Sequence, residues 1–388
     1  MRKLTLFSIF LAAVVIILGA YTRLTDAGLG CPDWPGCYGH VTVPLSEEKV
    51  AAANAAYPER PVEAAKAWNE MIHRYFAGTL GLCVLAIAVL AVKGRHNGTP
   101  VRLPVVLLCL IIFQAALGMW TVTLNLLPVV VMGHLLGGFS VLACLFILYL
   151  RLRDHQPDAV TFKHSNSVPL DDVEKISHTQ HKLRRFALVG VAIVVVQIAL
   201  GGWTSANYAA LACTELPICE SGWQERLDVV GAYSVPEAEN YEFGAHDYGE
   251  RVTMHILHRA GALVTFVYIV ALGISVLFSQ RTSAPIKRIA QFVLGSLILQ
   301  VALGISNVVF MLPLGVAVLH NAVAAILLLS LLALVYYLTP LSNRRSVSIF
   351  GGQRHAKVGN SPIVMAANAS SASYSSHSIT KASGGFHG

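Results

Sequence analysis

Eight segments of this 388-residue chain are apolar enough, and long enough, to cross a lipid bilayer as helices. A hydrocarbon core of about 30 Å needs about 20 helical residues, since each residue advances the helix by about 1.5 Å. A spanning helix also satisfies its own backbone polar groups, for which hydrocarbon offers no partner. We therefore expect an all-α integral membrane protein with eight transmembrane helices, at Leu4–Thr22, Met71–Val92, Leu103–Thr123, Leu127–Leu150, Leu183–Trp203, Met254–Phe278, Ile289–Phe310 and Leu314–Leu338.

Composition and the placement of charge agree with a membrane protein and predict its orientation. Hydrophobic residues make up 55% of the chain and charged residues 13%, which excludes an ordinary soluble domain. With eight spans the basic residues fall on one side, and the positive-inside rule assigns that side to the cytoplasm. Both termini are then cytoplasmic and the two long cysteine-bearing loops periplasmic. Because no Arg- and Ser-rich presequence precedes the first span, we expect a bacterial inner (plasma) membrane.

The net charge of +7 reflects the cytoplasmic bias of the basic residues. It predicts membrane lipid as the surroundings and no nucleic-acid partner, because no basic surface with interleaved aromatic residues is present. The first apolar segment follows Arg2 and Lys3, as a secretory signal does. We expect it to be retained as a helix, because it has a counterpart inside the chain.

That counterpart belongs to an internal repeat. Residues 18–37, LGAYTRLTDAGLGCPDWPGC, align without gaps on residues 200–219, LGGWTSANYAALACTELPIC. Two shorter repeats follow in the same order, QAALGMWTV at Gln114 with QVALGISNV at Gln300, and MGHLLGG around His134 with VLHNAVAA around His320. Three matches at nearly one offset indicate a duplicated unit.

The duplication predicts the domain organisation. We expect two pseudo-symmetric four-helix bundles of the same topology, 1–150 and 183–340, related by an axis along the membrane normal. A polar cytoplasmic linker, 151–182, joins them. The Ser-, Ala- and Gly-rich tail, 341–388, lacks a core-forming pattern and is expected to be disordered and cytoplasmic.

Four of the seven cysteines form two pairs in corresponding loops. Cys31 and Cys37 bracket PDWPG, and Cys213 and Cys219 bracket TELPI. Both loops are expected on the oxidising side, so we predict the disulfides Cys31–Cys37 and Cys213–Cys219. The spacing differs from the C-x-x-C-H of covalent haem attachment, and a metal site would lack nearby His at ligand spacing. A redox-active role for the first pair stays open.

Four histidines form two pairs at matching positions, His73 with His134 and His258 with His320. Ionisable residues at membrane depth are rare and often functional. Each lies within about two turns of the outer start of its expected helix, so the two rings of a pair share nearly one depth. Two such imidazoles can approach one iron from opposite faces, so bis-histidine ligation of a haem explains both pairs. Zinc would want four converging ligands, and the plain alternative is hydrogen bonding between packed helices.

Small and basic residues accompany these histidines. Arg74 and Arg259 follow the first histidine of each pair and are candidate partners for haem propionates; the alternative is snorkelling to lipid headgroups. Glycines that would let a flat macrocycle approach the backbone stand at Gly78, Gly81, Gly133, Gly137, Gly138 and Gly261.

Taken together, these motifs resemble the haem A synthase family, membrane enzymes that convert haem O to haem A for cytochrome oxidase. The resemblance covers about Leu4 to Leu338 and is carried by TRLTDAGLGCPDWPGC, EMIHR, QAALGMWTV, GHL, the second HR and LH. The set is specific, although each motif alone would be weak. It implies that the C-terminal half holds a permanent haem b on its histidine pair and that the N-terminal half binds the substrate haem. The implied iron ligands are His258 and His320 for haem b, and His73 and His134 for the substrate.

The resemblance also implies a reaction and partners. The C8 methyl of haem O would be oxidised to a formyl group through successive hydroxylations, after which the geminal diol loses water. Haem O is then the substrate. Haem O synthase and cytochrome oxidase assembly factors are candidate partners, and a homo-oligomer stays open.

One position distinguishes the two halves. EMIHR carries Glu70 where the second copy, HILHR, carries His255. Glu70 lies one helical turn before His73 and on the same face, so it could relay protons or stabilise positive charge on the oxidised carbon. We predict that Glu70 is catalytic; the alternative is a simple (i, i+4) ion pair with Arg74. His255 lies one turn before His258 and could in principle replace it as a ligand.

Two rival functions make different predictions. A di-haem b membrane electron-transfer cytochrome, linked to quinol, shares the bis-histidine logic but gives no reason for Glu70 or the cysteine loops. A transporter built from repeats would break its helices with Gly or Pro near the midplane. The polar residues here cluster instead near the outer helix ends.

Overall fold

The computed structural model of the protein describes residues 1–97, 99–154 and 170–339. In these ranges it is helical, without strands, and eight helices are long and apolar enough to span a membrane, which confirms the expected fold class. They are α1 (Arg2–Leu24), α3 (Ala64–Lys93), α4 (Arg102–Thr123), α5 (Pro128–Asp154), α6 (Leu170–Ala206), α8 (Tyr248–Phe278), α9 (Ala284–Val309) and α10 (Leu314–Leu338). The expected tail, 341–388, and residues 155–169 of the expected linker lie outside the described residues.

Three helices begin six or more residues before their expected apolar segments, and α9 begins five before, at Ala284 rather than Ile289. α3 begins at Ala64 rather than Met71, α8 at Tyr248 rather than Met254, and α6 at Leu170 rather than Leu183. Polar residues with good helix propensity extend each helix beyond its apolar segment. α8 also has a capping box, in which Asp247 and Glu250 satisfy each other's backbone N–H groups.

Because α3 and α8 begin earlier than expected, two histidines lie farther from their helix starts. His73 lies nine residues after the first residue of α3, and His258 ten after that of α8. His134 and His320 each lie six residues after the start of theirs. The two members of a pair therefore lie at different distances from their helix starts, whereas the sequence had suggested nearly equal distances. The extra turns of α3 and α8 extend outward from the apolar segments.

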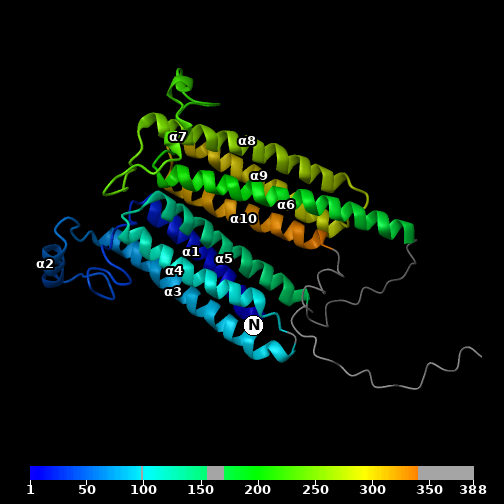
Figure 1. Ribbon diagram of the computed structural model, residues 1–388, viewed down its shortest axis with the longest axis horizontal. Coiled ribbons are helices and arrows are strands. Elements are labelled where there is room, and N and C mark those ends of the chain that lie inside the picture. Colours follow the sequence, from blue (N-terminus) through cyan, green and yellow to red (C-terminus); the bar gives the residue numbers. More distant parts are fainter. Residues whose placement is uncertain (98, 155–169, 340–388) are drawn as a thin grey trace, which may run out of the picture. The chain divides into compact units, whose positions relative to one another are not determined.

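Each half packs its four helices through the same pairs of neighbours (Figure 1). In the N-terminal half α1 packs on α3 and α5, and α4 packs on α3 and α5. In the C-terminal half α6 packs on α8 and α10, and α9 packs on α8 and α10. Each helix contact of the N-terminal half thus has a counterpart in the C-terminal half, with α1, α3, α4 and α5 corresponding to α6, α8, α9 and α10. Pseudo-symmetry of the two bundles stays a prediction, which these matched neighbours support.

The halves meet along α1 with α10 and α5 with α6, and α5 also packs on α10. Fully buried leucines from both halves, among them Leu145, Leu148 and Leu331, belong to one continuous core. At one end of the helices Arg23 donates to the Ser205 carbonyl at 2.6 Å. The hydroxyl of Tyr208 donates to Asp26 at 2.8 Å, so polar contacts reinforce the apolar interface there.

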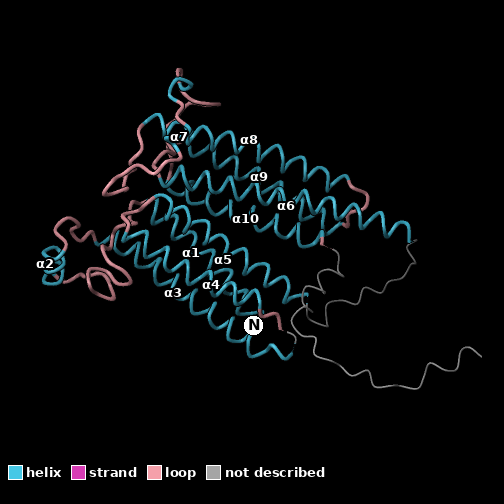
Figure 2. The backbone as a smooth tube through the Cα atoms, viewed as in Figure 1, coloured by secondary structure: helices cyan, strands magenta, loops and turns pink. Residues whose placement is uncertain are grey.

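Irregular segments join the helices at their ends (Figure 2). The short helices α2 (Glu47–Ala56) and α7 (Val229–Ala232) stand at one end of the long helices, and the N-terminus lies at the other (Figure 1). Two 3-10 turns complete the described elements, at Gly94–Asn97 and Trp223–Arg226. The long segments between α1 and α3 and between α6 and α8 carry the two cysteine pairs, which lie close to the N-terminal parts of α3 and α8.

Candidate functional site

The first histidine pair meets between α3 and α5. The ring centroids of His73 and His134 lie 6.4 Å apart, and the ring planes are nearly perpendicular, at 80°. The Nδ1 atoms of both rings are buried and find no hydrogen-bond partner in the described part of the chain. Buried polar atoms are normally paired, so these two nitrogens are available to a group that the protein itself does not supply.

The second pair, on α8 and α10, is surrounded by amides. Gln197 of α6 lies with its Nε2 atom 3.1 Å from Nδ1 of His258, and it donates to the His258 carbonyl at 2.9 Å. Nε2 of Gln300 lies 3.3 Å from Nε2 of His320, whose Nδ1 is buried without a partner among the described residues.

The first pair fits a shared metal ion. With a metal–nitrogen bond of about 2 Å on each side, two imidazoles that share one ion hold their ring centres about 6 Å apart. The 6.4 Å between His73 and His134 agrees with that arrangement. The same separation also lies within the range of about 4.5–7 Å for rings in direct edge-to-face contact. The two imidazoles would therefore fit as ligands of a haem iron.

The glycines expected to admit a macrocycle have varied surroundings. A side chain added at Gly78 or Gly81 would meet nothing within 4 Å, so their faces are open. Gly137 and Gly261 instead lie against Gln114 and Gln197, which occupy the space beside them.

Glu70 holds the first cysteine loop against α3. It is 4% exposed, and its Oε2 accepts the backbone N–H of Cys31 at 2.9 Å. Its Oε1 accepts from Arg74 at 2.5 Å, an ion pair along the helix. The alternative role considered for Glu70, a pair with Arg74, is thus present in the structure, and a bond to the loop accompanies it.

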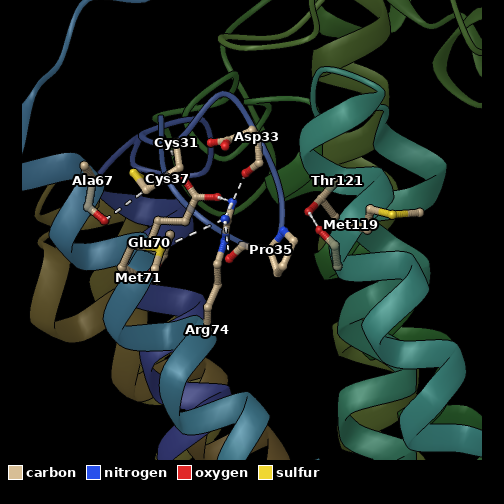
Figure 3. Close-up of polar contacts among 12 residues, drawn as sticks. Cys31, Asp33, Pro35, Cys37, Ala67, Glu70, Met71, Arg74, Met119 and Thr121 are labelled. Atoms are coloured by element: carbon tan, nitrogen blue, oxygen red, sulfur yellow. Dashed lines mark hydrogen bonds and ion pairs between the residues drawn. A yellow bond between two sulfur atoms is a disulfide. The ribbon is translucent and has the colours of Figure 1, made fainter. Parts of the chain in front are cut away.

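Arg74 completes this anchor. Its NH1 group donates to the carbonyls of Asp33 at 2.9 Å and Gly36 at 2.5 Å, with Pro35 at 3.3 Å (Figure 3). Arg presents several N–H donors in a fixed fork, which suits a ring of carbonyls. Both terminal nitrogens of Arg74 therefore face the protein, and its expected role as a propionate partner stays a prediction.

His255 and Arg259 repeat the anchor in the C-terminal half. The backbone N–H of Cys213 lies 3.3 Å from Nδ1 of His255, and Nε of Arg259 lies 3.2 Å from its Nε2. Arg259 also donates to the carbonyls of Cys213 at 2.6 Å and Glu215 at 2.8 Å, and to that of Ile218. A neutral imidazole has only one acceptor nitrogen, so His255 can accept from one of its two donors at a time, whereas the Glu70 carboxylate accepts from both.

Both expected disulfides are present. Cys31 bonds to Cys37 and Cys213 to Cys219, each across six positions of sequence. In each loop a carboxylate side chain adds hydrogen bonds to the cross-link made by the disulfide. Asp33 accepts the backbone N–H groups of Tyr38 at 2.7 Å and Gly39 at 2.8 Å.

In the second loop this role falls to Glu220, whose Oε1 accepts from the backbone N–H and the hydroxyl of Thr214, both at 2.8 Å. The backbone hydrogen bond is the largest cause that lowers the pKa of Glu220 to about 2. In the first loop, burial raises the pKa of the Tyr38 phenol. Glu220 therefore remains charged near neutral pH and holds its loop closed.

Sequence reasoning missed the glutamines. Gln300 lies in the repeated Q-x-A-L-G motif, which was read as a marker of duplication and not as a contact of His320. Gln197 has no such signal, because the aligned residue of the first half is Val15. An amide within a spanning segment was nevertheless a usable clue, since polar groups in hydrocarbon seek partners.

Comparison with known proteins gives consistent matches across the chain. The family model described as cytochrome oxidase assembly protein matches residues 2–332. A haem A synthase of Shewanella oneidensis is 48% identical over 335 residues, which cover 86% of this chain and 95% of that protein. A haem A synthase of a Chelativorans species is 29% identical over 338 residues, covering 81% and 84%. One from Bacillus licheniformis is 26% identical over 311 residues, covering 79% and 85%.

The match therefore extends over all eight spanning helices and both cysteine loops, and the 48% identity is spread over most of both chains. On these grounds the chain belongs to the COX15-CtaA family of cytochrome oxidase assembly proteins.

Proposed function

We propose that this protein is a haem A synthase, a membrane oxidoreductase that oxidises the C8 methyl of haem O to a formyl group. The observation that carries the proposal is the 6.4 Å pairing of His73 and His134, with unpartnered buried nitrogens, in a chain 48% identical to a haem A synthase. Cytochrome oxidase assembly is the setting that the family description supplies.

The two halves divide the work in this proposal. The N-terminal half, 1–150, binds the substrate haem through His73 and His134. The C-terminal half, 183–340, holds haem b through His258 and His320. Haem b in that place would supply one-electron transfer.

Gln197 supports the assignment of the permanent cofactor to the C-terminal half, whereas Gln300 has a counterpart in the first half, Gln114. Amides that contact ligand imidazoles fix the orientation of the rings, and such neighbours raise the affinity of metal sites. His255 is a poorer ligand candidate than His258, because donors from Cys213 and Arg259 face both of its ring nitrogens.

Glu70 is the proposed proton acceptor beside the substrate. Its carboxylate lies one helical turn before His73 and is almost fully buried. A carboxylate has about four lone-pair sites, and the bonds from Cys31 and Arg74 use two of them. Glu70 can therefore anchor the loop and still accept a proton or stabilise positive charge on the reacting carbon.

The proposed location is the bacterial inner membrane, with both termini cytoplasmic and the cysteine loops periplasmic. Each histidine pair then lies toward the periplasmic leaflet, under one disulfide loop. Haem O synthase and cytochrome oxidase assembly factors are the partners proposed to exchange haem with the protein.

Expression beside a source of haem O, followed by chromatography of the extracted haems, tests the function. The synthase should yield haem A together with haem b. A di-haem b electron carrier would contain haem b alone, and that result would overturn the proposal. Glu70→Gln, which removes the charge but keeps the shape, should retain bound haem and lose haem A.

A further inference from the structure

Each of the four paired histidines lies with its ring edge against a glycine of a neighbouring helix. In the N-terminal half, a Cβ added to Gly19 of α1 would come within 3.0 Å of Cε1 of His73. One added to Gly118 of α4 would come within 3.3 Å of Cε1 of His134. The two rings are thus packed against bare backbone on the side away from their own helices.

The C-terminal half has the same contacts. A Cβ on Gly201 of α6 would lie 2.9 Å from Cε1 of His258, and one on Gly304 of α9 would lie 3.1 Å from Cε1 of His320. The histidines stand on α3, α5, α8 and α10, whereas the glycines stand on the four other spanning helices, α1, α4, α6 and α9. The same carbon of the ring is the nearest atom in all four cases.

These distances leave no space for a methyl group. Real Cβ atoms rarely lie within 3.4 Å of another side-chain atom, so alanine at these positions requires the ring or the helix to move by a few tenths of an ångström. Coordination bonds to metals hold their lengths within about 0.2 Å. A displacement harmless to ordinary packing is therefore large for a ligand that must reach an iron.

Other glycines of the same helices show that this packing is local. Alanine at Gly78, Gly81, Gly295 or Gly315 would meet nothing within 4 Å. Gly78 lies on α3 only five residues after His73, and Gly295 lies on α9 nine residues before Gly304. Close approach to a histidine ring is thus specific to four positions and is not a general property of glycine in these helices.

We infer that Gly19, Gly118, Gly201 and Gly304 are positioning residues that fix the four imidazoles for iron ligation. The inference rests on the proposed function, in which these imidazoles hold two haems. Because Cε1 lies between the two ring nitrogens, a stop at this atom limits both the tilt of the ring and its rotation about the bond to Cβ. Each half would then use two helices to carry ligands and two to orient them.

Four single variants test the inference, Gly19→Ala, Gly118→Ala, Gly201→Ala and Gly304→Ala, with Gly315→Ala and Gly295→Ala as matched controls. The readouts are haem bound per protein and the low-spin absorption and electron paramagnetic resonance spectra of the purified holoprotein. Gly201→Ala and Gly304→Ala should lose about 10-fold or more of the haem b affinity and shift its spectrum. The controls should match the parent protein in both respects.

The two variants of the N-terminal half carry their own test of folding. Gly19→Ala and Gly118→Ala should keep the haem b spectrum of the C-terminal half while losing substrate haem, which shows that the protein is folded. Parent-like spectra and haem content in all four variants would overturn the inference. Loss of thermal stability with an unchanged spectrum of the remaining haem would also overturn it, because helix packing alone predicts that result.

Failure of the proposed function looks different. Parent protein that binds haem but forms no haem A would refute the enzyme and leave the four variants informative about ligation. Parent protein that binds no haem would overturn both.

Discussion

The N-terminal and C-terminal halves of this protein share their scaffold and differ in the residues beside the histidine rings. Both anchor a disulfide loop through an arginine that donates to loop carbonyls, Arg74 in one half and Arg259 in the other. Both pack their histidine rings against glycines. The differences lie at two aligned positions, Glu70 against His255 and Val15 against Gln197.

These two differences favour different chemistry in the two halves. Glu70 brings a charged carboxylate with two acceptor oxygens to the first half, where His255 offers a single acceptor. Gln197 brings an orienting amide to His258, where the aligned Val15 has no polar side chain to offer His73. The first half is thus equipped for proton chemistry and the second for a fixed ligand, although the surrounding packing is alike.

Exchanging the residues at the helix mouth tests the difference most strongly. Glu70→His should reduce haem A formation by about 100-fold or more, because histidine can keep one bond of the anchor but brings no negative charge to stabilise positive charge on the reacting carbon. Chromatography of extracted haems measures the effect. The reciprocal change, His255→Glu, should still give haem A and hold its loop through two bonds. Full activity in Glu70→His would show that Glu70 only anchors the loop and has no role in the reaction.

Removal of each disulfide compares the two loops. The double changes Cys31→Ser with Cys37→Ser, and Cys213→Ser with Cys219→Ser, should each lower the free energy of unfolding by about 2–3 kcal/mol on a loop-entropy argument. Thermal unfolding in detergent gives this quantity.

Limited proteolysis then separates the loops. Without its disulfide, the first loop should resist cleavage better than the second loop without its own. The reason is that the Glu70 carboxylate accepts from both Cys31 and Arg74. Equal cleavage of the two loops would show that the second acceptor oxygen adds nothing.

The amide difference should have a moderate effect. Gln197→Val should lower haem b affinity by about 10- to 100-fold, the usual cost of removing a group that orients a metal ligand. The measurement is haem retained during dilution, followed by its low-spin spectrum. Val15→Gln should tighten substrate haem in the first half and slow its release. An unchanged haem content in Gln197→Val would show that Gln197 serves only the backbone carbonyl of His258.

The smallest expected effect concerns pH and the second loop. Hydrogen bonds from Thr214 hold the pKa of Glu220 at about 2, below its ordinary value, so the stabilisation is present above the ordinary pKa and is lost as pH falls toward 2. Accessibility of the Cys213–Cys219 disulfide to a phosphine reductant should therefore rise between about pH 4.5 and 2. Glu220→Gln should flatten this dependence; an identical profile in the variant would contradict the role of Glu220.

Much of the fold could be predicted from the sequence because it depends on local composition. The eight spans and the two disulfides followed from runs of apolar residues and from cysteine pairs with five residues between them, and the structure has them. The early starts of α3, α6 and α8 were missed, since polar residues such as Lys66 continue a helix beyond its apolar part without marking the fact by hydrophobicity.

The candidate site was predictable in its ligands and less so in its surroundings. The repeat identified His73, His134, His258 and His320 as pairs, but no pattern showed that Glu70 reaches Cys31. That bond joins residues 39 positions apart, and its geometry depends on the loop folding back over α3.

The sequence by itself determined which segments enter the membrane, which cysteines pair and which half carries the carboxylate. Partition into hydrocarbon depends on the composition of about 20 consecutive residues, so it can be read along the chain. Only the tertiary structure decided that Gly19 meets His73 and that Gly201 meets His258. Such contacts depend on the rotation and crossing of whole helices, which all their neighbours set together through close packing.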